Sequence, residues 1–125
     1  MAETLELKPL EWVGSAYKDY MDFPAKLRHD MGYALYLAQM GEQYESATVL
    51  KGCGDAQILE LKGSHVGSTY RAVYTVRFDE VVYALHCFQK KSHRGKKTPQ
   101  LDLELIKTRL RAAERMHRET YGKKK

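Results

Sequence analysis

Apolar and polar residues alternate in three runs in the second half of the chain, and this alternation predicts three β-strands. The runs span residues 57–62, 69–78 and 81–89. They are rich in the β-branched and aromatic residues that strands favour. A polar loop at 63–68 and a tight turn at Asp79-Glu80 separate them, so we expect an antiparallel meander. An earlier alternating run at 5–8, stopped by Pro9, predicts one more strand.

Apolar residues at helical spacing predict two helices in the first half of the chain. The longer helix carries its apolar residues at intervals of four, four and three: Leu27, Met31, Leu35 and Ala38. Pro24 suits the first turn of this helix, because its missing N–H costs nothing there, and Gly41 is a natural stop. A shorter helix is expected before it, from Ser15 as the N-cap through Asp22.

The last part of the chain predicts a third helix with clear boundaries. Thr98 is expected at the N-cap, Pro99 at the first helical position and Gly122 at the end. The element order is therefore β-α-α-β-β-β-α. It predicts an α+β fold in which two N-terminal helices and one C-terminal helix flank a small antiparallel sheet. We expect one domain over residues 1–122 and a disordered basic tail at 123–125.

The net charge of +5 for 125 residues hides a division between the two halves of the chain. Residues 1–60 have a net charge of −5, whereas residues 61–125 have a net charge of +10. This division favours a polyanionic partner for the basic half. No apolar run is long enough for a membrane span, the start is acidic, and the two cysteines lie 34 residues apart. We therefore expect a cytoplasmic protein that does not associate with membranes.

The densest basic run lies between the last predicted strand and the last helix. It contains five cations and one histidine: Lys90, Lys91, His93, Arg94, Lys96 and Lys97. A helix N-terminus offers free N–H groups and the positive end of a dipole, so this corner is a candidate phosphate site. A solvated basic turn is the alternative interpretation of the same run.

Strand alternation gathers further charges on one face of the sheet. Glu60 and Lys62 share a face of one predicted strand, and Arg71 and Arg77 share a face of the next. If Lys62 and Arg71 flank the hairpin loop, the two cations lie close together. Either they bind an anion, or Glu60 lies between them as a structural partner.

The chain has no Ser-His-acid arrangement, glycine-rich phosphate loop or metal-ligand cluster, so we expect activity without a metal or other cofactor. RNA cleavage by the substrate's own 2′-OH needs only groups that orient it, transfer protons and stabilise charge on the phosphate. Arg71 suits the phosphate because its planar fork binds two oxygens. A lysine or His93 suits proton transfer, since a cationic surrounding favours its neutral form.

Two sequence motifs resemble the RelE/ParE toxin superfamily. ILELK at 58–62 with YRAVY at 70–74 resembles its EL[RK] … YR-x-x-Y signature. HCFQKK at 86–91 with TP at 98–99 is similar to the F-x-K-K … T-P pattern of the HigB-type, phage-related branch. By position, Lys62 and Arg71 match the sheet-face cations of the superfamily, and Lys90 and Lys91 match the basic end of its last strand.

The resemblance implies a toxin of a type II toxin–antitoxin module that cleaves mRNA in the ribosomal A site. It also implies neutralisation by a helix-turn-helix antitoxin of the HigA type. Two alternatives stay open: a ParE-like inhibitor of gyrase, and a phage-derived protein that binds RNA without cleaving it. We expect Lys62, Arg71, Lys90, Lys91 and His93 to be catalytic. We expect Arg77, Arg94, Lys96 and Lys97 to bind RNA, with Glu60 as structural support.

Overall fold

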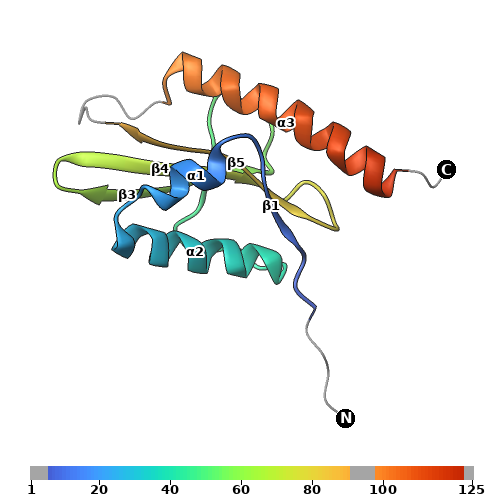
Figure 1. Cartoon of the computed structure of the whole chain (residues 1–125), viewed down its shortest axis with the longest axis horizontal. Coiled ribbons are helices and arrows are strands. Elements are labelled where there is room, and N and C mark those ends of the chain that lie inside the picture. Colours follow the sequence, from blue (N-terminus) through green and yellow to red (C-terminus); the bar gives the residue numbers. More distant parts are fainter. Residues whose placement is uncertain (1–5, 91–97, 123–125) are drawn as a thin grey trace, which may run out of the picture.

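A computed structural model describes residues 6–90 and 98–122 of the chain, and it shows five strands and three helices (Figure 1). In chain order these are β1 (Leu10–Trp12), α1 (Ala16–Met21), α2 (Ala25–Gln39), β2 (Thr48–Val49), β3 (Ile58–His65), β4 (Ser68–Thr75), β5 (Val82–Lys90) and α3 (Gln100–Tyr121). The predicted α+β fold is confirmed, with two helices before the three long strands and one after them. In this part of the chain no helix is long and apolar enough to cross a membrane.

The strands form one sheet in the order β1-β5-β4-β3-β2, with β4 in the centre. The predicted meander of β3, β4 and β5 is antiparallel, and β2 adds antiparallel to its outer edge. The other edge differs from the prediction, because β1 lies parallel to β5 and begins after Pro9 instead of at residue 5. The Pro9 carbonyl accepts a hydrogen bond from the Val82 N–H, so the proline leads into the strand instead of ending one.

The hairpin between β3 and β4 is tighter than the predicted six-residue loop. Pairing continues to His65 and Ser68, so only Val66 and Gly67 form the turn. Both have positive φ, 44° and 76°, which is the backbone of a type I′ turn and matches the twist of the flanking strands. The connection between β4 and β5 is longer than the predicted turn, because β4 ends at Thr75 and β5 begins at Val82.

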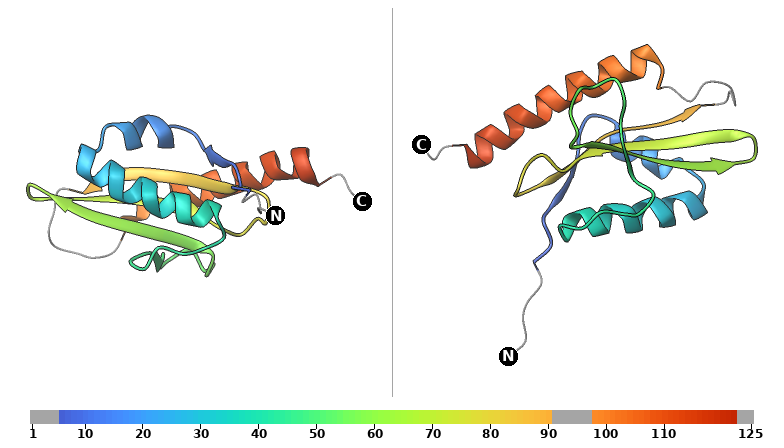
Figure 2. Two further views of the ribbon diagram at one scale, coloured as in Figure 1. Left: turned by 90° about the horizontal axis from the view of Figure 1, so that it is seen from below. Right: turned by 180° about the vertical axis from the view of Figure 1, so that it is seen from behind.

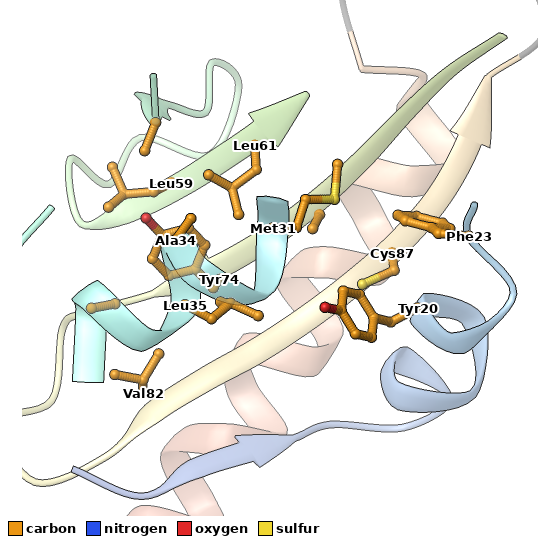
Figure 3. Packing of buried hydrophobic residues seen from close by; sticks show 13 residues of the cluster. Tyr20, Phe23, Met31, Ala34, Leu35, Leu59, Leu61, Tyr74, Val82 and Cys87 are labelled. Atoms are coloured by element: carbon orange, nitrogen blue, oxygen red, sulfur yellow. The ribbon is translucent and has the colours of Figure 1, made fainter. Parts of the chain in front are cut away.

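Helices α1 and α2 cover one face of the sheet and bury the larger apolar cluster. Figure 3 shows Met31 and Leu35 of α2 directed at Leu61 and Tyr74, with Tyr20 of α1 beside Cys87 of β5. All of these side chains are buried. The apolar residues spaced by about four along α2 thus pack against the alternating apolar residues of the strands in one layer, as the sequence pattern predicts.

Helix α3 covers the opposite face of the sheet. Its buried residues Ile106 and Ala113 pack against Ile58, Val73 and Leu85. The segment that follows α2 passes around the sheet edge towards α3, as the right-hand view of Figure 2 shows. Gly52 in this segment has φ +100°, and a Cβ there would lie 2.9 Å from Leu103 Cδ1. The segment therefore passes close to the start of α3.

The buried core predicts a loss of stability at alkaline pH. Burial raises the pKa of the Cys87 thiol from 9.0 to about 12 and that of the Tyr74 hydroxyl from 10.0 to about 12. Between these values the unfolded chain releases protons that the folded chain keeps, so the free energy of unfolding falls as pH rises from about 9 to about 12.

Denaturant titrations across this pH range test the effect, with Cys87→Ala as the informative variant. Its free energy of unfolding should fall less steeply with pH than that of the wild type, because only the tyrosine contribution remains. Parallel pH curves for the two proteins would show that the thiol ionises equally well in both states.

Candidate nucleic-acid interface

The pairing of β3 with β4 brings two of the predicted site residues together. Lys62 lies directly opposite Arg71 in the register, and Glu60 lies two residues away on the same face of β3. The Lys62 side chain is half-exposed, at 45%, whereas Arg71 is only 3% exposed. The two cations therefore share a face of the sheet, but they differ sharply in access to solvent.

A carboxylate lies between these two cations. Glu60 Oε2 is 2.9 Å from Arg71 Nη1, and Glu60 Oε1 is 4.0 Å from Lys62 Nζ. Glu60 is itself buried, so it compensates the charge of Arg71 inside the protein. This arrangement explains how two like charges are tolerated opposite each other, because the Glu60 carboxylate lies between them.

Arg71 also connects the sheet to the start of α3. Its Nη1 donates to the Thr98 hydroxyl at 3.3 Å, and Thr98 is buried. The prediction of Thr98 as the N-cap was wrong, because Pro99 occupies that position and α3 begins at Gln100. The hydroxyl faces the arginine instead of the helix, so the Thr-Pro pair ties the helix to the charged face of the sheet.

A groove lies where these elements meet, with a volume of about 740 Å³. Its lining comes from β2 and the residues after it, from β3 and from the start of α3: Thr48, Val49, Leu50, Lys51, Gly52, Glu60, Lys62, Thr98, Gln100 and Leu103. The first-turn N–H groups of the 22-residue helix α3 have no partner within the helix and form the positive end of its dipole. Lys62 and this helix end give the groove the features of an anion site.

A second contact holds the start of α3 on β5. His86 Nε2 lies 2.7 Å from Asp102 Oδ1, and His86 Nδ1 lies 3.3 Å from Arg109 Nη1. The Arg109 guanidinium can only donate and the Asp102 carboxylate accepts, so the two ring nitrogens of His86 meet a donor on one side and an acceptor on the other. His86 is thus a packed histidine, and both of its ring nitrogens are engaged by α3.

Arg77 lies apart from this groove. It follows the end of β4 and pairs with Asp55, at 3.8 Å, and with Glu114 of α3. Together with Cys53 and Lys107 it lines a separate hollow of about 480 Å³. The strand alternation that predicted a common face for Arg71 and Arg77 does not reach Arg77, because β4 ends at Thr75.

Lys90 is the last residue of β5 and lies opposite Thr69. Arg71 lies opposite Phe88, two residues before Lys90, so alternation places Lys90 on the same sheet face as Arg71. The other candidates of the basic run, Lys91, His93, Arg94, Lys96 and Lys97, lie outside the residues that the structure describes. Within residues 6–90 and 98–122, no three His, Cys, Asp or Glu side chains gather as a metal site.

Comparisons with known proteins identify the family of the chain and its fold. Residues 18–111 match the family model described as "Phage derived protein Gp49-like". The chain belongs to this family. In a search of curated proteins, none matched the chain.

Three solved structures are similar to this Gp49-like chain. A mutant of E. coli toxin RelE in the free state is 18% identical, with 85% of this chain and 97% of that chain covered and a TM-score of 0.52. A crystal structure of the isolated E. coli RelE toxin is 19% identical, with 81% and 97% covered and a TM-score of 0.50. A chain of the toxin–antitoxin complex RelBE2 from Mycobacterium tuberculosis is 13% identical, with 73% and 100% covered and a TM-score of 0.45. The two E. coli likenesses confirm the expected RelE-type fold.

Several residues of the groove in this Gp49-like chain were missed by the sequence analysis. Lys51, Val49 and Leu103 line it, yet the first two belong to a strand of only two residues and the turn that follows. Such a short strand leaves no alternation to detect. The only signal was the glycine-rich turn, where Gly52 with its positive φ lets the chain approach Leu103.

Because the Glu60–Arg71 pair is buried, we expect Arg71 to contribute far more to the free energy of unfolding than the neighbouring Lys62. Arg71→Met leaves an uncompensated buried carboxylate and should lower the free energy of unfolding by about 3–5 kcal/mol. Lys62→Met removes only a half-exposed partner at 4.0 Å and should cost less than about 1 kcal/mol. Urea titrations of the two variants measure both values.

The double variant Glu60→Leu/Arg71→Met serves as the control, because it removes both charges. It should be more stable than Arg71→Met alone. Equal losses for Arg71→Met and Lys62→Met would contradict the assignment of Arg71 to a buried structural pair.

Proposed function

We propose that this chain is the toxin of a type II toxin–antitoxin module, of the HigB type, and that it inhibits translation by cleaving mRNA. The observation that carries the proposal is the groove, where half-exposed Lys62 and the N-terminus of α3 meet on the charged face of a RelE-type sheet. Two sources of positive charge at one concave site suit a phosphodiester better than a protein surface.

The proposed reaction uses the nucleophile of the substrate. The 2′-oxygen forms a bond to the adjacent phosphorus, the bond from phosphorus to the 5′-oxygen breaks, and a 2′,3′-cyclic phosphate remains. One proton leaves the 2′-hydroxyl and one is given to the 5′-oxygen, so no redox partner or other reactant is needed. The protein contributes orientation, proton transfer and stabilisation of the charge that develops on the phosphate.

The groove offers distinct groups for these tasks. We assign phosphate binding to Lys62 and to the first-turn N–H groups of α3. Arg71 acts from beneath as a positioning residue, because it is buried and holds Glu60 and Thr98. Proton transfer is assigned to Lys90, the last residue of β5, and to Lys91 and His93, which come after it in the sequence and lie outside the described residues.

The proposed partners follow from the same assignment. Messenger RNA in the ribosomal A site is the substrate, and a helix-turn-helix antitoxin of the HigA type is the inhibitor. The proposed place of action is the cytoplasm, where translation takes place.

A specific observation favours one second candidate, an RNA-binding protein that does not cleave. The one histidine of the described chain that packs beside the start of α3, His86, is engaged at both ring nitrogens by Asp102 and Arg109. It is therefore not available as a proton carrier without breaking a contact. In this alternative the cations of the groove bind RNA, and the chain blocks translation or masks RNA by occupancy alone.

Expression in a bacterial host tests the proposal. The wild-type chain should arrest growth, and Lys62→Ala should relieve the arrest, since it removes the exposed cation that lies beside the start of α3; the groove's other exposed cation, Lys51, remains. Lys26→Ala is the matched control: it is an exposed lysine on α2 that also lies beside a carboxylate, at 3.8 Å from Asp30. This control should stay toxic, and circular dichroism of all three proteins should show the same fold.

Primer extension on a translated message separates the candidates. Cleavage should produce new 5′ ends that are absent with Lys62→Ala, whereas a non-cleaving RNA binder leaves messages intact. Intact messages together with altered plasmid supercoiling would instead identify a gyrase inhibitor. Toxicity that persists in Lys62→Ala would contradict the assignment of the groove.

A further inference from the structure

The groove contains more than its cationic corner. Val49, Leu50 and Leu103 form an aliphatic wall in the same hollow as Lys62 and Thr98. Leu50 is only 2% exposed and supports the wall from beneath, and Leu103 packs against the core beneath α3, so these two are held in place by the fold. Val49 is 48% exposed on the outermost strand. Free phosphate needs none of this apolar surface, because its binding depends on charge and hydrogen bonds alone.

The combination restricts the kind of ligand that fits. A ligand that uses the whole groove needs an anionic group for Lys62 and the start of α3, and an apolar face for the aliphatic wall. A nucleotide has both, because its base carries an apolar face within a few bonds of its phosphate. The groove volume of about 740 Å³ lies within the usual range of small-ligand sites, roughly 300–1,000 Å³.

We propose that Val49 and Leu103, supported by the buried Leu50, form a nucleobase subsite, which takes the base next to the phosphate held at Lys62. This inference rests on the proposed function and specifies how the same groove holds its substrate. The base is held by aliphatic contact, since no aromatic side chain lines the groove among the residues that the structure describes. Such contact gains affinity in proportion to the apolar area that it removes from water.

Two polar side chains lie in the groove near this wall. Thr48 precedes Val49 in β2, and Gln100 is the first residue of α3, one turn before Leu103. The Gln100 amide nitrogen donates to Glu104 at 3.3 Å, and its carbonyl oxygen accepts hydrogen bonds. These groups supply hydrogen bonds to a base edge, while the aliphatic wall favours purines because they bury more surface.

Binding of small probes tests the subsite without any cleavage. Titrations with AMP, UMP and ribose 5-phosphate, followed by NMR shifts of the labelled protein, compare the same phosphate with and without a base. We expect AMP to bind at least about 5-fold more tightly than ribose 5-phosphate, with UMP between them.

Variants assign this preference to the wall. Val49→Ser should bring the affinity for AMP down to that for ribose 5-phosphate and leave ribose 5-phosphate binding unchanged. Lys62→Ala should weaken all three probes. Val66→Ser, at the exposed tip of the β3–β4 hairpin, is the matched control and should bind like the wild type.

Equal affinities of the wild type for AMP and ribose 5-phosphate would overturn the subsite, and so would a Val49→Ser variant that weakens both probes alike. The experiments also distinguish a failure of the subsite from a failure of the proposed function. If the protein prefers AMP but neither arrests growth nor cuts messages, the subsite is supported and the toxin assignment is contradicted. If the protein cuts messages but binds AMP and ribose 5-phosphate equally, the toxin assignment is supported and the subsite is contradicted.

Discussion

The buried ion pair between Glu60 and Arg71 is the interaction on which the rest of the site depends. An arginine in a nearly solvent-free position requires a carboxylate at 2.9 Å, and that carboxylate in turn faces Lys62. The same guanidinium reaches Thr98 and so fixes the start of α3 against the sheet. One buried pair thereby sets the position of the accessible lysine, the helix N-terminus and the groove between them.

The contact between His86 and Asp102 complements this pair from the neighbouring strand. Arg71 of β4 contacts Thr98, just before α3, and His86 of β5 contacts Asp102, in the first turn of α3. A long helix held at its N-terminus by two separate side-chain contacts has a fixed direction for its dipole. The groove is therefore preorganised, so a bound phosphate does not need to order the helix end itself.

The sequence predicted the fold well because its patterns are local. The alternation of apolar and polar residues predicted the bounds of β3, β4 and β5 to within a few residues, and the period-four spacing predicted α2. The parallel strand β1 and the two-residue strand β2 have no such pattern in the sequence. The site was predicted only in part. Lys62, Arg71 and Glu60 meet as expected, but burial of Arg71 depends on how α3 covers the sheet, and Thr98 serves that contact instead of a helix cap. Tertiary contacts of this kind have no local signature.

The salt dependence of RNA binding tests most directly whether the groove holds a phosphate at Lys62. A short single-stranded RNA with a 2′-deoxy substitution at each residue of the cleavage site can be titrated without being cut. The slope of log affinity against log salt should be about 0.7 smaller in magnitude for Lys62→Ala than for the wild type, since one phosphate contact is lost, and it should be unchanged for Lys26→Ala. An identical slope for Lys62→Ala and the wild type would contradict the account.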